Sequence, residues 1–227
     1  MSSPELYSRI HSSNFERIRS GQVEIDKILA SGLPDLRSGI SLIIPVRGMR
    51  KEYAAIVERM ERAAPDQYYY PFEDLHVTVF DFLQASGSYS RNADLESAFL
   101  WISREAAASA GSFPIKMKGL VFSQAAGLIK GYDDDVLIGL RKRIRDGMAA
   151  CGMANDERYE SESAHVTFMR FMGILADPGS LCGALKELEE FDLGAEKVTE
   201  LELVEHDWYN TRVTKRVIGT VGLVTAG

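Results

Sequence analysis

Residues 75–83 read LHVTVFDFL, and residues 164–172 read AHVTFMRFM. The tripeptide His76-Val77-Thr78 therefore recurs as His165-Val166-Thr167, in a chain that has only four histidines. Residues outside the tripeptide match at the same offset: Tyr70 with Tyr159, Glu73 with Glu162, and Phe82 with Phe171. This pattern indicates an internal duplication in which each half supplies one imidazole and one hydroxyl group.

Each motif lies in a stretch whose apolar, β-branched composition is typical of a strand. Because side chains alternate across a strand, His76 and Thr78 share one face and Val77 lies on the other. His165 and Thr167 share a face in the same way. The aliphatic faces are expected to pack under helices, which leaves the two His/Thr faces directed at each other across a groove.

The rest of the chain surrounds these strands with further strand and helix patterns. Strands are expected at 40–46, 75–83, 113–123, 127–132 and 164–172, helices at 49–64, 93–110, 133–150 and 178–190, and a final hairpin at 198–207 and 213–224. The order strand, helix, HVT strand occurs twice, which predicts an α+β fold with two similar lobes.

The domain organisation follows from the same pattern. Residues 1–36 are polar and have no match in the second half, so they predict an N-terminal helical extension packed on the core or over its opening. We expect residues 37–227 to form one bilobal domain with halves near 37–90 and 111–190. The sequence does not assign residues 195–227 to either half. No linker rich in Pro, Gly or Ser separates the halves.

Composition limits the classes of function. The chain has 227 residues, 45% of them apolar, and a net charge of −7. An acidic protein is a poor binder of long nucleic acid, because phosphate neutralisation supplies most of that affinity, but one small phosphate ester remains compatible. We expect no signal peptide, no membrane span, and two reduced thiols at Cys151 and Cys182, which predicts a cytoplasmic protein, expected to be a monomer.

Two imidazoles and two hydroxyls around a small volume suit a phosphodiester. Imidazole titrates near neutrality, so one ring can accept a proton while the other donates one. The hydroxyls of Thr78 and Thr167 can donate hydrogen bonds to the non-bridging phosphate oxygens. No His/Asp cluster with the spacing of a hydrolytic metal site is evident, so neither a metal nor a cofactor is expected.

The paired motifs resemble those of the 2H phosphoesterase superfamily, the two-histidine proteins with H-x-[TS]-x motifs. The resemblance covers roughly residues 38–224 and implies a bilobal α+β fold of two antiparallel-rich sheets with outer helices around a central cleft. Members include RNA 2′,3′-cyclic phosphodiesterases, also called 2′-5′ RNA ligases, and nucleotide cyclic phosphodiesterases. The resemblance implies metal-independent catalysis by His76 and His165, one activating the nucleophile and the other protonating the leaving oxygen, without saying which is which.

Five further residues are candidates for the rim of the substrate site: Tyr132, Lys130, Tyr70, Arg170 and Trp208. Strict alternation places Arg170 on the face opposite His165 unless a bulge intervenes. The paired glutamates before the two motifs are placed on that opposite face as well. The basic run at 141–145 is interpreted as a solvated helix face. His11 and His206 lack the threonine partner and are interpreted as ordinary.

The sequence therefore predicts a phosphodiesterase for a 2′,3′-cyclic phosphate or a related small nucleotide or RNA-end phosphodiester. Two alternatives stay open: a nucleotide- or phosphate-binding module without catalysis, and reversible 2′-5′ RNA ligation, which the absence of a basic face disfavours. The sequence does not indicate the base preference or whether a 2′ or 3′ phosphate is the product.

Overall fold

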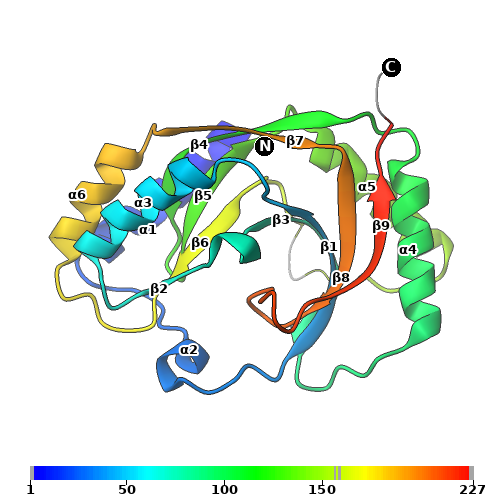
Figure 1. The fold of residues 1–227 in the computed structure, drawn as a ribbon, viewed down its shortest axis with the longest axis horizontal. Coiled ribbons are helices and arrows are strands. Elements are labelled where there is room, and N and C mark those ends of the chain that lie inside the picture. The colour runs from blue at the N-terminus through cyan, green and yellow to red at the C-terminus, as the bar shows by residue number, and fades with distance from the viewer. Residues whose placement is uncertain (1–2, 156, 158–159, 225–227) are drawn as a thin grey trace.

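The computed structural model describes residues 3–155, 157 and 160–224, so Tyr159 lies outside the described residues. The described part forms a mixed α+β fold of α-helices around a curled antiparallel sheet (Figure 1). The α-helices are α1 (Ser3–Arg19), α2 (Lys27–Ser31), α3 (Arg50–Ala63), α4 (Ala93–Ala107), α5 (Val136–Ala150) and α6 (Pro178–Leu188). The strands are β1 (Ser38–Pro45), β2 (Tyr68–Tyr69), β3 (His76–Ser86), β4 (Phe113–Phe122), β5 (Ala126–Tyr132), β6 (Val166–Arg170), β7 (Asp192–Val198), β8 (Glu200–His206) and β9 (Arg216–Gly222). A short 3-10 helix, η1 (Phe72–Asp74), precedes β3.

The strands form one sheet in the order β7-β4-β5-β6-β3-β1-β8-β9, with β2 paired on β6. Neighbouring strands in this order run antiparallel. The α+β class with two similar antiparallel halves is confirmed. The pair Val77–Val166 joins β3 to β6, so the two expected sheets are continuous and the two motif strands lie side by side at the centre.

One half of the sheet is β7-β4-β5-β6, and the other is β3-β1-β8-β9. The hairpin expected near the end of the chain forms β8 and β9, and it lies beside β1. Strand β7 is not expected from local sequence, because its sequence DLGAEKV is polar and contains a glycine. It forms because β4 supplies a pairing edge, which local sequence does not reveal.

The helices also connect the halves. Helix α3 follows β1 but packs beside α6, whereas α5 follows β5 but packs beside α4 (Figure 1). Each pair therefore takes one helix from each repeat. Helix α5 also contacts β3, and α4 contacts β9. The exchange ties the two halves into one body.

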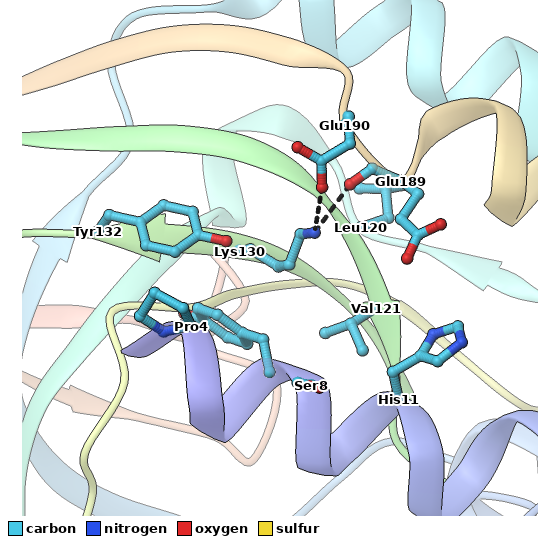
Figure 2. Close-up of a pocket in the computed structure, with 10 residues that line it drawn as sticks. Pro4, Ser8, His11, Leu120, Val121, Lys130, Tyr132, Glu189 and Glu190 are labelled. Atoms are coloured by element: carbon cyan, nitrogen blue, oxygen red, sulfur yellow. Dashed lines mark hydrogen bonds and ion pairs between the residues drawn. The ribbon is translucent and has the colours of Figure 1, made fainter. Parts of the chain in front are cut away.

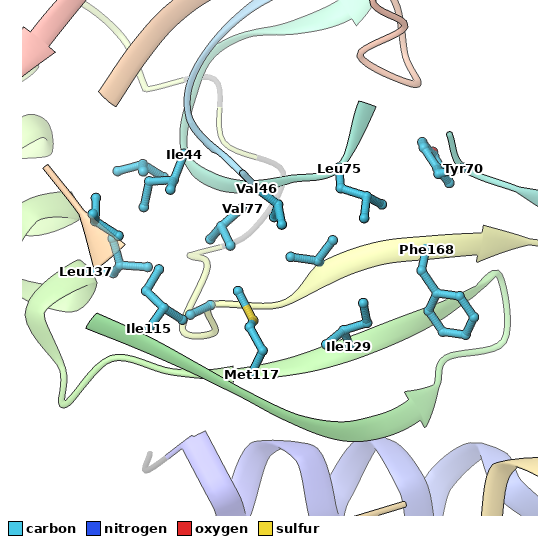
Figure 3. Close-up of a cluster of buried hydrophobic side chains, with 14 of the residues drawn as sticks. Ile44, Val46, Tyr70, Leu75, Val77, Ile115, Met117, Ile129, Leu137 and Phe168 are labelled. Carbon is cyan, nitrogen blue, oxygen red and sulfur yellow. The ribbon is translucent and has the colours of Figure 1, made fainter. Parts of the chain in front are cut away.

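One face of the sheet carries the hydrophobic core, which includes Ile44, Val77 and Ile129 (Figure 3). Val166 pairs with both Val77 and Ile129 and belongs to the same cluster. Burial of such side chains stabilises a fold by about 25 cal/mol per Å² of apolar surface. The opposite face, called the motif face below, carries His76, Thr78, His165 and Thr167.

The N-terminal extension lies on this motif face. Leu128 of β5 pairs with Thr167 of β6, so their side chains share a face. Tyr7 of α1 packs against Leu128. Figure 3 shows α1 on the side of β4 and β5 that faces away from core side chains such as Ile129. Helix α1 therefore covers the part of the motif face that β4 and β5 provide.

Candidate active site

The structure brings the two HVT motifs together at the junction of the sheet halves. Val77 and Val166 form the pair that joins the motif strands, and both point into the core. Their sequence neighbours therefore point to the other face from adjacent strands. The four side chains gathered there are His76, Thr78, His165 and Thr167, each partly exposed.

The ring of His76 is oriented by backbone and by an amide. Its Nδ1 lies 2.8 Å from the carbonyl oxygen of Asp74 and 3.0 Å from the side-chain nitrogen of Asn210. A carbonyl oxygen only accepts hydrogen bonds, so Nδ1 carries the hydrogen and Nε2 keeps its lone pair. The buried Oδ1 of Asn210 has no partner among the described residues, and a half-turn of the amide would bring it to the Nδ1 hydrogen.

The ring of His165 has a different partner. Its Nδ1 lies 2.7 Å from Oγ of Ser163. A hydroxyl can donate or accept, so it can support Nδ1 with or without a hydrogen. His165 can therefore change its protonation state without losing this hydrogen bond, whereas the neutral tautomer of His76 is fixed.

Both imidazoles are held in the neutral form in the free protein. Burial lowers the pKa of His76 to about 3, and the charges of His206, Lys215 and His165 add to this. Burial also lowers the pKa of His165 to about 4, with smaller contributions from Arg141 and Arg170. Lys215, Arg141 and Arg170 place positive charge near the two rings, and a bound anion would offset their effect on the ring pKa values.

A β-bulge changes the position of Arg170. Thr167 and Met169 pair with consecutive residues of β5, so Phe168 is an extra residue in β6. Phe168 and Met169 both belong to the core, and Arg170 therefore returns to the motif face. Strict alternation would place Arg170 opposite His165, and the bulge, the exception allowed for in the sequence, reverses that placement.

Arg170 meets two other rim candidates. Its Nε donates to the hydroxyl of Tyr70 at 2.8 Å, and its guanidinium carbon lies 5.9 Å from the ring centre of Trp208. Among the described residues, no carboxylate lies within 4 Å of this guanidinium to form an ion pair. The structure thus groups Tyr70, Arg170 and Trp208, with an arginine whose charge is not neutralised by direct pairing.

Lys130 and Tyr132 are directed elsewhere. Figure 2 shows them on one side of a cavity of about 250 Å³, with α1 on the other. The ammonium group of Lys130 donates to the carbonyl oxygen of Glu189 at 2.8 Å and lies 3.4 Å from Glu190. The ring of Tyr132 packs edge-on against Tyr7. Lys130 therefore contacts the segment after α6, and Tyr132 contacts the extension.

The interpretation of 141–145 as a solvated helix face is wrong for Arg141, which is buried. It is 1% exposed and donates hydrogen bonds of 2.8 Å to the carbonyl oxygens of Val79, Thr78 and Ser163. The guanidinium therefore bridges β3 and the segment that leads into β6. Helical spacing contains a signal for this, since Arg141 falls on the buried stripe with Leu140 and the other apolar positions of α5.

His206, which was interpreted as ordinary because it lacks a threonine partner, also lies on the motif face. A bulge in β3 places Asp81 there, and Asp81 accepts a 2.5 Å hydrogen bond from Ser41 Oγ. Nε2 of His206 lies 2.7 Å from the same oxygen, and Nδ1 lies 2.5 Å from the carbonyl oxygen of Asp207. Burial lowers the pKa of His206, and Asp81 raises it. The Ser41 hydroxyl thus connects His206 to Asp81 in one hydrogen-bonded chain.

Metal sites, membrane spans and disulfides are not found in the part of the chain that the structure describes. No three His, Cys, Asp or Glu side chains in that part are placed to hold a metal ion. No described helix has the length and apolar character needed to cross a membrane. Cys151 is exposed and Cys182 is buried, and both are free.

Known proteins resemble this chain in structure. No family model and no curated protein sequence matches it. TT0787 of Thermus thermophilus is 14% identical, with a TM-score of 0.59 over 84% of this chain and 100% of that one. A structure described as a phosphoesterase is 14% identical, with a TM-score of 0.55 over 84% and 99%. E. coli LigT complexed with 3′-AMP is 16% identical, with a TM-score of 0.55 over 82% and 98%.

At these identities the likeness shows a common fold. It is the fold that the resemblance to the 2H phosphoesterase superfamily implied, so that resemblance is confirmed at the level of the fold. The matches extend over nearly the whole length of the solved chains. The matched region therefore includes both halves of the sheet, and not just a single repeat.

Proposed function

We propose that this chain, with the fold of the 2H phosphoesterases, hydrolyses a 2′,3′-cyclic phosphate or a related small phosphodiester without a metal ion. One observation carries the proposal: the Val77–Val166 pair places two His/Thr pairs side by side on one partly exposed face. A structural role for the valines does not require histidine and threonine on the opposite face. A phosphodiester uses all four polar groups.

The hydrogen bonds support different roles for the two histidines, His76 as general base and His165 as general acid. His76 has Nδ1–H directed at a carbonyl, so its Nε2 accepts the proton of the attacking water. As the oxygen of that water bonds to phosphorus, the bond to the leaving ribose oxygen breaks. His165, which takes up a proton once the bound phosphate anion offsets the neighbouring cations, donates that proton from Nε2 to the leaving oxygen, while Ser163 accommodates either state of Nδ1.

The phosphate itself is held by neutral and charged donors. The hydroxyls of Thr78 and Thr167 donate to its non-bridging oxygens, where charge develops in the transition state. Arg170 supplies the positive charge, since the described residues offer it no ion pair. The phosphoesterase and the 3′-AMP complex among the structural neighbours support phosphodiester chemistry and a nucleotide ligand for this fold.

The test is a turnover assay on the four nucleoside 2′,3′-cyclic monophosphates in excess EDTA. We expect each active reaction to give a single nucleoside monophosphate, 2′ or 3′, and EDTA to leave the rate unchanged. Loss of activity in EDTA would contradict the metal-independent mechanism. Binding without turnover across cyclic and open diesters would instead support a binding module, and joining of RNA ends would support ligation.

Replacing Arg170 tests the proposed phosphate contact. Arg170→Met is expected to lower kcat/KM by about 10- to 100-fold, mostly through KM, because a hydrogen bond to a charged group contributes about 1.5–3 kcal/mol. Arg170→Lys should recover part of the loss, since it keeps the charge but not the paired donors. Arg62→Met, at an exposed arginine paired with Glu58, is the matched control. An unchanged KM in Arg170→Met would remove Arg170 from the site.

A further inference from the structure

The N-terminal extension and the motifs occupy the same side of the sheet. Tyr7 of α1 is 3% exposed, and its hydroxyl accepts a hydrogen bond from the backbone nitrogen of Gly131 and donates to the carbonyl oxygen of that residue, both at 3.0 Å. Gly131 precedes Tyr132 in β5, the strand next to the one that carries Thr167. Helix α1 is therefore a wall beside the motifs.

Helix α1 packs against the rest of the protein near both of its ends. Tyr7 forms a small apolar cluster with Val121, Ala126 and Leu128. At the other end of the helix, Ile18 is 1% exposed and belongs to the main core. Anchors at both ends of a helix of four to five turns fix its position, so α1 is part of the site and not a loosely attached lid.

The segment after α1 closes one end of the motif face. The backbone nitrogen of Asp26 donates to the carbonyl oxygen of Phe171, just beyond Arg170, at 2.7 Å. Oδ1 of Asp26 accepts a 2.8 Å hydrogen bond from the hydroxyl of Tyr209, which lies in the loop between β8 and β9 of the other half. Further along, the guanidinium of Arg37 stacks 4.5 Å from the ring centre of Trp208. The extension thus connects the two halves at the Arg170 end.

The part of the motif face that β1 and β8 provide is not suited to binding a polyanion. On the β1 and β8 side the motif face carries Asp81 and Glu202 together with His206. Glu202 is paired with Arg47, which is therefore not free for a phosphate. An RNA strand needs a cation for each of several successive phosphates. Of the cations named above, Arg141 is buried against three backbone carbonyl oxygens, which leaves Arg170 and Lys215, enough for one or two phosphates.

We propose that the N-terminal extension makes this site selective for a cyclic phosphodiester the size of a single nucleotide and excludes the 3′ end of an RNA strand. This inference rests on the proposed function. Helix α1 covers the motif face over β4 and β5, so a chain of nucleotides cannot continue across these strands, and the 24–37 segment closes the Arg170 end. A mononucleotide extends in neither of these two directions.

The test compares two substrates of the intact protein that share the same reacting group. Adenosine 2′,3′-cyclic monophosphate and an RNA of about ten nucleotides ending in adenosine 2′,3′-cyclic phosphate would be assayed for kcat/KM at the same salt concentration. We expect the mononucleotide to be preferred by at least about 100-fold. Equal values, or a preference for the RNA, would overturn this inference and leave the proposed function standing. Turnover of neither substrate would overturn the proposed function and this inference with it.

Variants of the extension link the selectivity to α1. Tyr7→Ala removes the anchor at Gly131, and Asp26→Ala removes the contact with Tyr209 without touching α1. Each is expected to raise RNA turnover relative to mononucleotide turnover by about 10-fold. Arg9→Ala, on the exposed side of α1, should leave the ratio unchanged. An unchanged ratio in both variants, with folding verified by circular dichroism, would contradict a role for the extension.

Discussion

His76→Ala and His165→Ala are each expected to lower kcat by about 10²–10⁴-fold, the usual contribution of one positioned proton transfer. The loss should appear in kcat more than in KM, because the imidazoles act on protons that move in the transition state. The double variant should be little worse than the worse single variant, since the two histidines act in one step. The measurement is steady-state hydrolysis of a nucleoside 2′,3′-cyclic monophosphate.

The control for this experiment is another histidine of the same chain. His11 stacks on Phe15 in α1 and has no threonine partner, so His11→Ala should keep wild-type kcat. Denaturation curves should confirm that the motif variants remain folded. Wild-type activity in either His76→Ala or His165→Ala would overturn paired-histidine catalysis.

Arg141→Met is expected to give the largest loss of stability, about 3 kcal/mol in the free energy of unfolding. The guanidinium donates to three buried carbonyl groups, two in β3 and one before β6, and methionine cannot donate to any of them. Burial lowers the pKa of Arg141 to about 10, so the side chain is still charged at neutral pH. Urea denaturation measures the change.

Activity should fall together with stability in Arg141→Met. Without the bridge, β3 and the segment before β6 are joined mainly by the Val77–Val166 pair, so the two His/Thr pairs are held less rigidly. Lys142→Met, one residue later on the exposed side of α5, is the matched control and should change stability by less than about 0.5 kcal/mol. Wild-type stability in Arg141→Met would show that the carbonyl groups find other partners.

The motif residues could be identified from the sequence because short-range rules are enough to find them. Repetition marks the two tripeptides, and alternation over three residues puts histidine and threonine on one face of each strand. Alternation fails beyond that range. The extra residue Phe168 in β6 returns Arg170 to the motif face, and the bulge in β3 does the same for Asp81.

The other missed residues depend on contacts between distant segments. Ser41, Asp81 and His206 come from three strands, and only the register of β1 with β3 and β8 brings them together. Arg141 becomes buried because α5 crosses to the half of the sheet that contains β3. A basic residue in a basic run has no sequence feature that distinguishes a bridge from a solvated surface, apart from its place on the apolar stripe.

By itself, the sequence determined the two His/Thr pairs, the α+β class and the acidic net charge, because composition, repetition and strand periodicity are local properties. The tertiary structure decided what surrounds those pairs. It placed the motif strands next to each other, turned Arg170 toward them through a bulge, and laid α1 over part of the same face. These outcomes depend on how strands register and how helices fill the space left to them, which is a property of the whole packed chain.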